Sequence, residues 1–232
     1  MDTSAEMREA WRRLYAVASG AALLYVVMVV VPLVLVFAAP GVPGTGGAAV
    51  LEYIAAHKAV YLVQLVCFVG LSVPALVVFT ATSISLYHAE RTLAVLGGLI
   101  GVASEIVALA LGSSPQSLNG GLVILSDQYM LAAAPQRLAL ATAAESLVAA
   151  TNAVSWAGIL TALGILLISI AMLRGVFHKG VAYLGIVAGA LGIVSETFRP
   201  SLGMGYILYG LLLPAWFVAV GVKLLRLGSG RA

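Results

Sequence analysis

The chain has 232 residues, of which 62% are hydrophobic and only 9% are charged, and its mean hydropathy is +1.10. Soluble domains are about half apolar and about a quarter charged, so this composition excludes an ordinary soluble protein. The net charge of +3 comes from scattered Lys and Arg residues, which form no basic face for nucleic acid. The single cysteine, Cys67, excludes an intrachain disulfide and a cysteine-rich metal framework. We therefore expect one integral membrane domain over residues 1–232, with the lipid bilayer as its partner.

Six apolar segments are long enough to cross a bilayer, because about 20 apolar residues in a helix span its hydrocarbon core. In chain order they cover residues 15–39, 59–87, 93–112, 153–173, 181–198 and 205–227. The sequence thus predicts an all-α membrane protein built as a six-transmembrane-helix bundle.

The connections between these segments are of unequal size. Residues 40–58 begin as a Gly/Pro loop and become a short helix, in which Leu51, Ile54 and Ala55 form an apolar stripe. The longest connection covers residues 113–152, and we expect it on the outer side. Within it, residues 136–150 predict an interfacial helix or an outward extension of the bundle, starting near Pro135, a residue favoured in the first turn of a helix.

Lys and Arg residues in the connections predict the orientation of the bundle. With the N-terminus inside, the inner side has Arg8, Arg12, Arg13, Arg91, Arg174, Lys179, Lys223, Arg226 and Arg231. The outer side has Lys58, Arg137 and Arg199. Because cytoplasmic loops are enriched in Lys and Arg, we expect both termini to be cytoplasmic.

One glutamate-bearing stretch occurs twice. "GLIGVASE" (Gly98–Glu105) returns 91 residues later as "GALGIVSE" (Gly189–Glu196), and both lie on helices expected to run from inside to outside. A fainter echo links residues 70–78 with residues 210–218, on helices of the opposite direction. The simplest interpretation is three repeated helical hairpins related by rotation about the membrane normal. Chance similarity in a chain rich in Gly, Ala, Val and Leu is the alternative.

The repeated glutamates are expected to point into helix interfaces. Gly98, Gly101 and Glu105 are spaced i, i+3, i+7, which is one face of a helix, and the second stretch repeats that spacing. Small residues on one face let helices approach closely in lipid. An ionised carboxylate at this depth costs at least about 2–3 kcal/mol, so each glutamate should be protonated, paired or hydrated.

Polar residues at similar depth or just above complete a candidate ligand-binding set. Its members are Glu105, Glu196, Gln64, Asn152, Ser155, Glu145, Asp127 and Arg199. Arg199 follows Glu196 by three residues, so the two can form an ion pair. Together they predict a polar, acidic pocket that opens outward and is capped by residues 113–152. The structural alternative is a glutamate pair that locks two hairpins together, with Glu196 and Arg199 as an interfacial ion pair.

Other chemistries find little support in the residues. His57 is expected outside, whereas His88 and His178 are expected at inner helix ends, so they predict no metal site. The chain has no phosphate-binding loop, dinucleotide fingerprint, GxSxG or HExxH motif in a usable context. We therefore expect no cofactor and assign no catalytic residue.

Three stretches in the second half carry a family resemblance: "APQRLALATAAESLVA", then "IAMLRGVF" at the end of a span, then "YLGIVAGALG" after a short basic turn. From about Ser117 to Gly192 the chain resembles a family of six-helix bacterial and archaeal membrane proteins known as domain of unknown function 4386. The resemblance implies a six-helix fold in a prokaryotic cell membrane and no particular activity.

The residues favour a transporter-like or ligand-binding membrane protein with an outward-facing site for a proton, a cation or a small polar molecule. An accessory or sensory subunit, in which the polar pairs only hold helices together, stays open. So does an intramembrane enzyme that uses Glu105 and Glu196 as acid and base, although no nucleophile accompanies them. The sequence leaves oligomerisation open.

Overall fold

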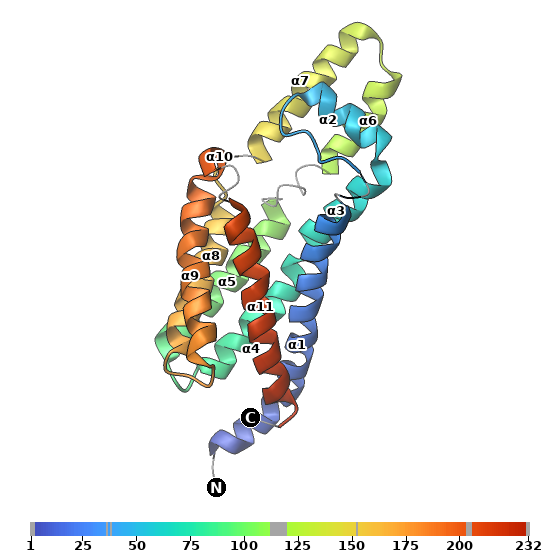
Figure 1. Cartoon of the computed structure of the whole chain (residues 1–232). Helices are drawn as coiled ribbons and strands as arrows, with labels where there is room; N and C mark the ends of the chain where they lie inside the picture. The colour runs from blue at the N-terminus through green and yellow to red at the C-terminus, as the bar shows by residue number, and fades with distance from the viewer. Residues whose placement is uncertain are drawn as a thin grey trace.

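The structure is a computed structural model that describes residues 3–35, 37, 39–111, 120–151, 153–202 and 206–230, without the side chains of residues 3–10, 111, 151 and 200. All regular secondary structure in these ranges is helical (Figure 1). The helices are α1 (Thr3–Leu35), α2 (Gly47–Ala56), α3 (Lys58–Gly70), α4 (Ser72–Leu86), α5 (Arg91–Leu111), α6 (Gly120–Leu131), α7 (Ala134–Thr151), α8 (Trp156–Met172), α9 (Lys179–Thr197), α10 (Arg199–Leu202) and α11 (Tyr206–Gly228).

Five stretches of the described helices are long and apolar enough to cross a membrane. They are Trp11–Leu35 of α1, Lys58–Leu86 across α3 and α4, Arg91–Ala110 of α5, Lys179–Thr197 in α9 and Tyr206–Gly228 in α11. Helix α8, where the sequence predicts a span over 153–173, is apolar but has only 17 residues. The chain is therefore an all-α integral membrane protein with at least these five helices suited to lipid.

The outer faces of the long helices are apolar. Large hydrophobic side chains are exposed on every one of them, for example Leu23, Val66, Leu99, Val187 and Leu211. Helices that are apolar on all sides are typical of membrane spans, because lipid makes no hydrogen bonds to side chains and favours hydrocarbon contacts. These faces are thus suited to acyl chains.

Three prolines, Pro32, Pro74 and Pro214, interrupt the helical hydrogen bonds of the candidate spans. Pro74 lacks an N–H group, so the carbonyl of Gly70 loses its helical partner, and α3 ends there. The chain nevertheless continues in nearly the same direction, because the N–H of Ala75 donates to the carbonyl of Leu71 at 3.2 Å. Pro214 lies inside α11 and has the same effect on the carbonyl of Gly210.

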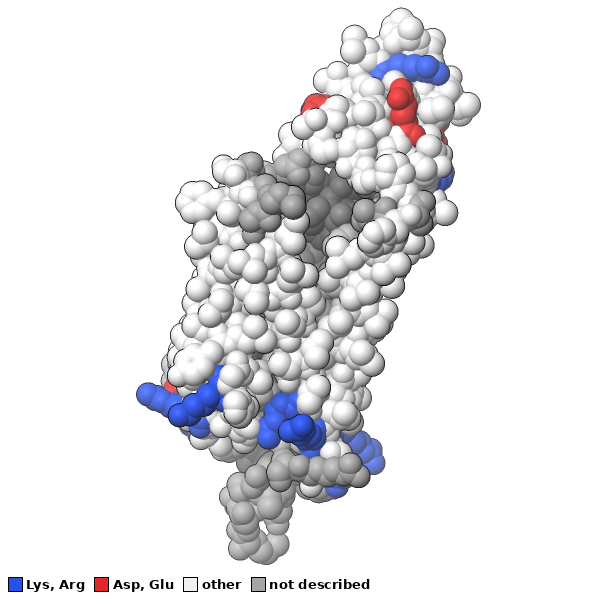
Figure 2. Space-filling model, in the orientation of Figure 1, with Lys and Arg blue, Asp and Glu red and all other residues white. Residues whose placement is uncertain are grey.

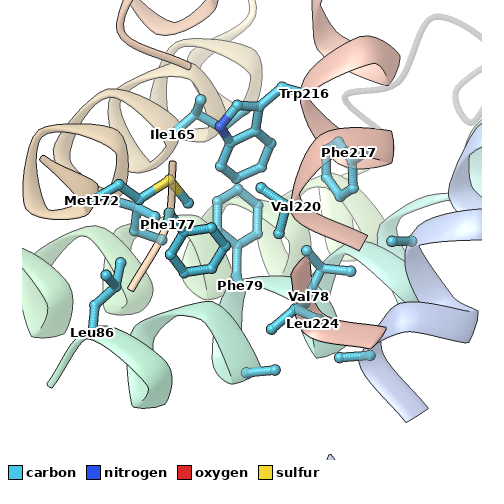
Figure 3. Close-up of a cluster of buried hydrophobic side chains, with 14 of the residues drawn as sticks. Val78, Phe79, Leu86, Ile165, Met172, Phe177, Trp216, Phe217, Val220 and Leu224 are labelled. Carbon is cyan, nitrogen blue, oxygen red and sulfur yellow. The ribbon is translucent and has the colours of Figure 1, made fainter. Parts of the chain in front are cut away.

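Six long elements form a ring around a common axis (Figure 1). Each packs on the next in chain order: α1 on α4, α4 on α5, α5 on α8, α8 on α9, α9 on α11, and α11 back on α1. Phe79, Trp216 and Phe217 fill the axis of this ring and are fully buried (Figure 3). The aromatic core therefore touches helices from both halves of the chain.

Glycines permit the closest helix crossings. A Cβ atom on Gly164 of α8 would stand 2.9 Å from both Cα and N of Gly101 on α5. Gly98 packs against Ser83, and Gly189 packs against the backbone of Ala162. Both glycine stripes therefore face neighbouring helices, as small residues in membrane proteins commonly do. The hairpin repeat itself stays a prediction.

The crossing of α5 and α8 gives a first testable prediction. Gly164→Ala should lower the free energy of unfolding by about 1–3 kcal/mol, because the new methyl meets backbone atoms that cannot rotate away. Gly20→Ala is the matched control, since its Cβ would meet nothing within 4 Å. Unfolding in detergent measures both, and equal stability of the two variants would contradict the crossing.

Helices α2, α6 and α7 form a separate small cluster, called here the end unit, at the end of the molecule opposite the start of α1 and the end of α11 (Figure 1). Its own core includes Leu51, Ile54, Leu122 and Tyr129. The predicted stripe is thus buried at Leu51 and Ile54, whereas Ala55 is exposed. Helix α6 is not anticipated by the sequence, because its two leading glycines and central Ser-Asp obscure a helical period.

Basic side chains gather at the end of the bundle where α1 begins and α11 ends (Figure 2). The described ones in the connections and helix ends there are Arg12, Arg13, Arg91, Arg174, Lys179, Lys223 and Arg226. At the opposite end they are Lys58, Arg137 and Arg199. The basic residues that the sequence assigns to the inner side and those that it assigns to the outer side therefore lie at opposite ends of the molecule.

Candidate functional site

A cavity of about 330 Å³ lies inside the helix ring, in the half nearer the end unit. Helices α1, α3, α4, α5, α8, α9, α10 and α11 all contribute to its wall. Both repeated glutamates, Glu105 and Glu196, line it. The ring thus brings together two residues that are 91 positions apart in the sequence.

Glu105 lies near the end of α5 and is almost fully buried, with 4% of its surface exposed. It sits six residues before Leu111, which is about 9 Å along the axis at 1.5 Å per residue. The hydroxyl of Thr161 on α8 donates to Glu105 Oε1 at 3.1 Å and lies 2.9 Å from Ser104 Oγ. The hydroxyl of Ser72, at the start of α4, faces the same carboxylate.

Glu105 forms no ion pair with a Lys or Arg among the described side chains. The stretches between residues 11 and 230 that lie outside the described set contain no charged residue in the sequence. Of the three basic residues near this end, Lys58 binds Asp127 and Arg199 binds Glu196, and the Nε of Arg137 donates to the carbonyl of Ala132. The charge of an ionised Glu105 therefore has no fixed counter-charge.

Glu196, at the end of α9, is held in a different way. Its Oε2 lies 2.7 Å from Nη2 of Arg199, and its Oε1 accepts a hydrogen bond of 2.7 Å from the Tyr206 hydroxyl. Arg199 also donates to the Tyr206 oxygen at 3.0 Å and lies over the Tyr206 ring, 5.3 Å from its centroid. The predicted pairing of Glu196 with Arg199 is confirmed.

The charge on Arg199 is maintained by its neighbours. Burial alone would lower the pKa of Arg199, but Tyr206 and Glu196 outweigh that effect and raise this pKa. The absence of a side chain at Gly158 lets Glu196 approach α8 closely, because a Cβ atom at Gly158 would lie 2.7 Å from Glu196 Oε2. The pair is therefore packed as one unit against the start of α8.

Ser155 also lines the cavity and caps α8, since its hydroxyl accepts a hydrogen bond of 3.1 Å from the N–H of Gly158. Ser155, Glu105, Glu196 and Arg199 are thus the predicted site residues that the structure brings together. Gln64 lies on α3 and is not part of the cavity wall. Asn152 lies outside the described residues.

Two predicted carboxylates lie in the end unit and not in the cavity. Asp127 on α6 forms a 2.7 Å ion pair with Lys58. Glu145 on α7 accepts a hydrogen bond from the N–H of Gly47, the first residue of α2. The Glu145 contact therefore joins α7 to the free N–H groups at the start of α2 within the end unit, whereas the Asp127 pair joins α6 to the start of α3. No described residue of 113–151 lines the cavity, so the described part of this segment does not form the expected cap.

The structure adds wall residues that the sequence does not single out. Thr161 is one hydroxyl in an apolar helix, and Ser72 lies beside the break before Pro74. The aromatic residues Tyr25, Phe68, Tyr206 and Tyr209 also line the cavity. For Tyr206 and Tyr209 the sequence does contain a signal, because their i, i+3 spacing close to Glu196 places both on one helix face near that carboxylate. The remaining wall residues lie on helices that are distant in sequence from the glutamates, and only the folded ring brings them near the cavity.

An aromatic cluster separates the cavity from the end where the termini lie. The Tyr25 ring stacks on Phe217 at a centroid distance of 3.7 Å and an interplanar angle of 6°. Phe217 in turn meets the edge of Phe79 at 6.4 Å and of Trp216 at 5.3 Å (Figure 3). Among the described residues, this cluster reaches the cavity through Tyr25, which lines it.

The wall of the cavity combines charged, hydroxyl and aromatic groups. It offers one carboxylate without a counter-charge, one neutralised carboxylate, several hydroxyls and aromatic rings.

Comparison of the chain with family models, with curated proteins and with solved structures found no match.

Proposed function

We propose that the protein is a ligand-binding or transporter-like membrane protein in which Glu105 holds a proton or a cation inside the helix ring. The observation that supports this most is the environment of Glu105. A buried carboxylate in a cavity, with hydroxyl neighbours but no basic partner among the described residues, needs a positive species to offset the cost of burial. Protons and cations are the species that meet this need.

A structural role fits Glu196 better than Glu105. Its carboxylate is already engaged by Arg199 and Tyr206, so it links α9, α10 and the start of α11 without any ligand. The contacts of Glu196 are of the kind expected for an accessory subunit, in which polar pairs only hold helices together. The proposal therefore assigns ligand binding to Glu105 and helix attachment to the Glu196 network.

The proposal includes six spans with both termini in the cytoplasm. Helix α8 would be the sixth, since 17 residues are at the short end of the length that crosses a bilayer. The basic residues at the end where α1 begins agree with a cytoplasmic position for that end. The cavity, in the other half, would then face outward.

Reporter fusions test this orientation. Fusions after Gly44 and after Gly120 should report the outside, and a fusion after Arg174 should report the inside, because basic connections stay in the cytoplasm. An inside signal from the fusion at Gly120 would contradict the six-span arrangement.

The function is tested by melting the purified protein in detergent. Glu105→Gln should fold, because glutamine is nearly isosteric with a protonated glutamate. The wild-type melting temperature should depend on pH and on added cations, and that cation effect should grow as pH rises, because protons compete for the same carboxylate. Glu105→Gln should lose both dependences, while Glu90→Gln, in the ion pair with Arg174 at the opposite end, should keep them. Identical curves for wild type and Glu105→Gln throughout would defeat the proposal and favour a purely structural role.

A further inference from the structure

The cavity wall points to a particular class of cation. We infer that the cavity takes a small organic ammonium ion with an apolar body, bound with its charged nitrogen at Glu105. This rests on the proposed function, because it specifies the cation that Glu105 would hold. Four properties of the wall support it: its net charge, its shortage of charged oxygen ligands, its aromatic rings and its volume.

The charge of the wall suits a monovalent ligand. Glu196 is neutralised by Arg199 at 2.7 Å, which leaves Glu105 as the carboxylate without a fixed counter-charge. A dication would require a second free carboxylate, and breaking the Glu196 pair to supply one would leave a buried guanidinium. One positive charge therefore matches this wall.

The wall supplies few charged oxygen ligands for a divalent metal ion, because Glu196 is already paired with Arg199. Ca²⁺ and Mg²⁺ take about six or more oxygen ligands. Here the hydroxyl of Thr161 is directed at Glu105 and Ser104, and Ser155 accepts from Gly158. In the part of the chain that the structure describes, no group of three or more His, Cys, Asp and Glu residues is placed to hold a metal ion.

Aromatic rings favour an organic cation. Tyr25, Phe68, Tyr206 and Tyr209 all line the cavity. Ring faces attract cations whose charge is weakly hydrated, and ammonium groups with apolar substituents are such cations. Tyr206 already behaves in this way toward Arg199, whose Cζ lies 5.3 Å from the ring centroid.

The volume exceeds what a bare ion would fill. About 330 Å³ lies at the low end of the range of about 300–1,000 Å³ found for small-molecule pockets. Val29, Leu71 and Leu213 supply apolar wall around the polar group. An ammonium group on a short aromatic or alkyl body would satisfy the carboxylate and cover this surface together.

The test uses the full chain in detergent and 2-phenylethylammonium as the probe. Its neutral counterpart, 2-phenylethanol, and the inorganic ions Na⁺, K⁺, Mg²⁺ and Ca²⁺ are titrated in parallel. Calorimetry and the melting temperature report binding. Wild type is compared with Glu105→Gln, with Ala108→Leu, which adds bulk to the cavity wall one turn from Glu105 but keeps its charge, and with the control Glu90→Gln.

We expect the ammonium probe to bind and stabilise wild type and Glu90→Gln, and 2-phenylethanol and the inorganic ions to have no such effect. Glu105→Gln should weaken the probe by about tenfold or more, because a charge-assisted contact is lost. Ala108→Leu should also weaken binding of the probe, because the apolar body of the probe no longer fits the cavity. This variant tests the cavity even if Glu105→Gln folds poorly.

Three outcomes would overturn the inference. Equal binding of the alcohol and the ammonium would show that charge is irrelevant to this cavity. Stabilisation by an inorganic ion but not by the amine, lost in Glu105→Gln, would refute the ammonium ligand and leave the proposed function standing. Responses that are all unchanged in Glu105→Gln would refute both.

Discussion

Glu196→Gln should lower the free energy of unfolding by about 3 kcal/mol, because it leaves the guanidinium of Arg199 buried without its carboxylate. The side chains of Arg199 and Glu196 are only 14% and 4% exposed, so bulk water is a poor replacement for the lost partner. Arg199→Gln should be destabilising for the complementary reason, since the carboxylate then keeps only the hydrogen bond from Tyr206.

The double variant Glu196→Gln/Arg199→Gln separates this pairing from simple damage to the packing. Two amides of similar shape carry no net charge, so most of the stability lost in either single variant should return. Reversible unfolding of the four proteins in mixed detergent measures the coupling. Losses in the double variant equal to the sum of the two single losses would show that Glu196 and Arg199 do not act as a pair.

Trp216→Ala should cost about 3 kcal/mol, at the lower part of the range for aromatic truncations, because the unfolded chain in detergent remains in apolar surroundings. Trp216 is fully buried in the aromatic core beneath the cavity, 5.3 Å from Phe217 and 6.3 Å from Phe79 between ring centroids. Its removal would leave a void among helices from both halves of the chain.

Trp156→Ala is the matched control, since Trp156 is 72% exposed at the start of α8. Its loss should change stability by less than about 0.5 kcal/mol. Equal effects of the two tryptophan truncations would contradict the position of Trp216 at the ring axis.

The long apolar helices are the part of the fold that the sequence predicts best, because bilayer thickness gives a simple length requirement. The fourth span shows the limit: Ala153 and Val154 extend the apolar run, but Ser155 caps α8 and starts the helix only at Trp156. Helix α6 was missed because Gly120 and Gly121 resemble a loop. Local pattern thus determined the presence of most helices but not where each one begins.

Local sequence pattern also predicts part of the candidate site, namely the residues whose charge or spacing stands out within one helix. Glu105 and Glu196 were identified because charge is rare in apolar helices, and Arg199 because it follows Glu196 by one helical turn. Glu145 and Asp127 are equally polar, but their partners Gly47 and Lys58 are distant in sequence, so nothing local indicated the end unit. Tyr25 and Phe68 are ordinary apolar residues in their own helices, and only the ring makes them cavity wall.

The most direct measurement of the central claim observes the Glu105 carboxyl group itself. Infrared difference spectra of the purified protein, with and without 2-phenylethylammonium, report changes in carboxylic acid and carboxylate bands. We expect a carboxyl difference signal in wild type and in Glu90→Gln that is missing from Glu105→Gln. A spectrum with no carboxyl change on saturation with ligand, or the same signal in Glu105→Gln, would contradict the claim that Glu105 is where a cation binds.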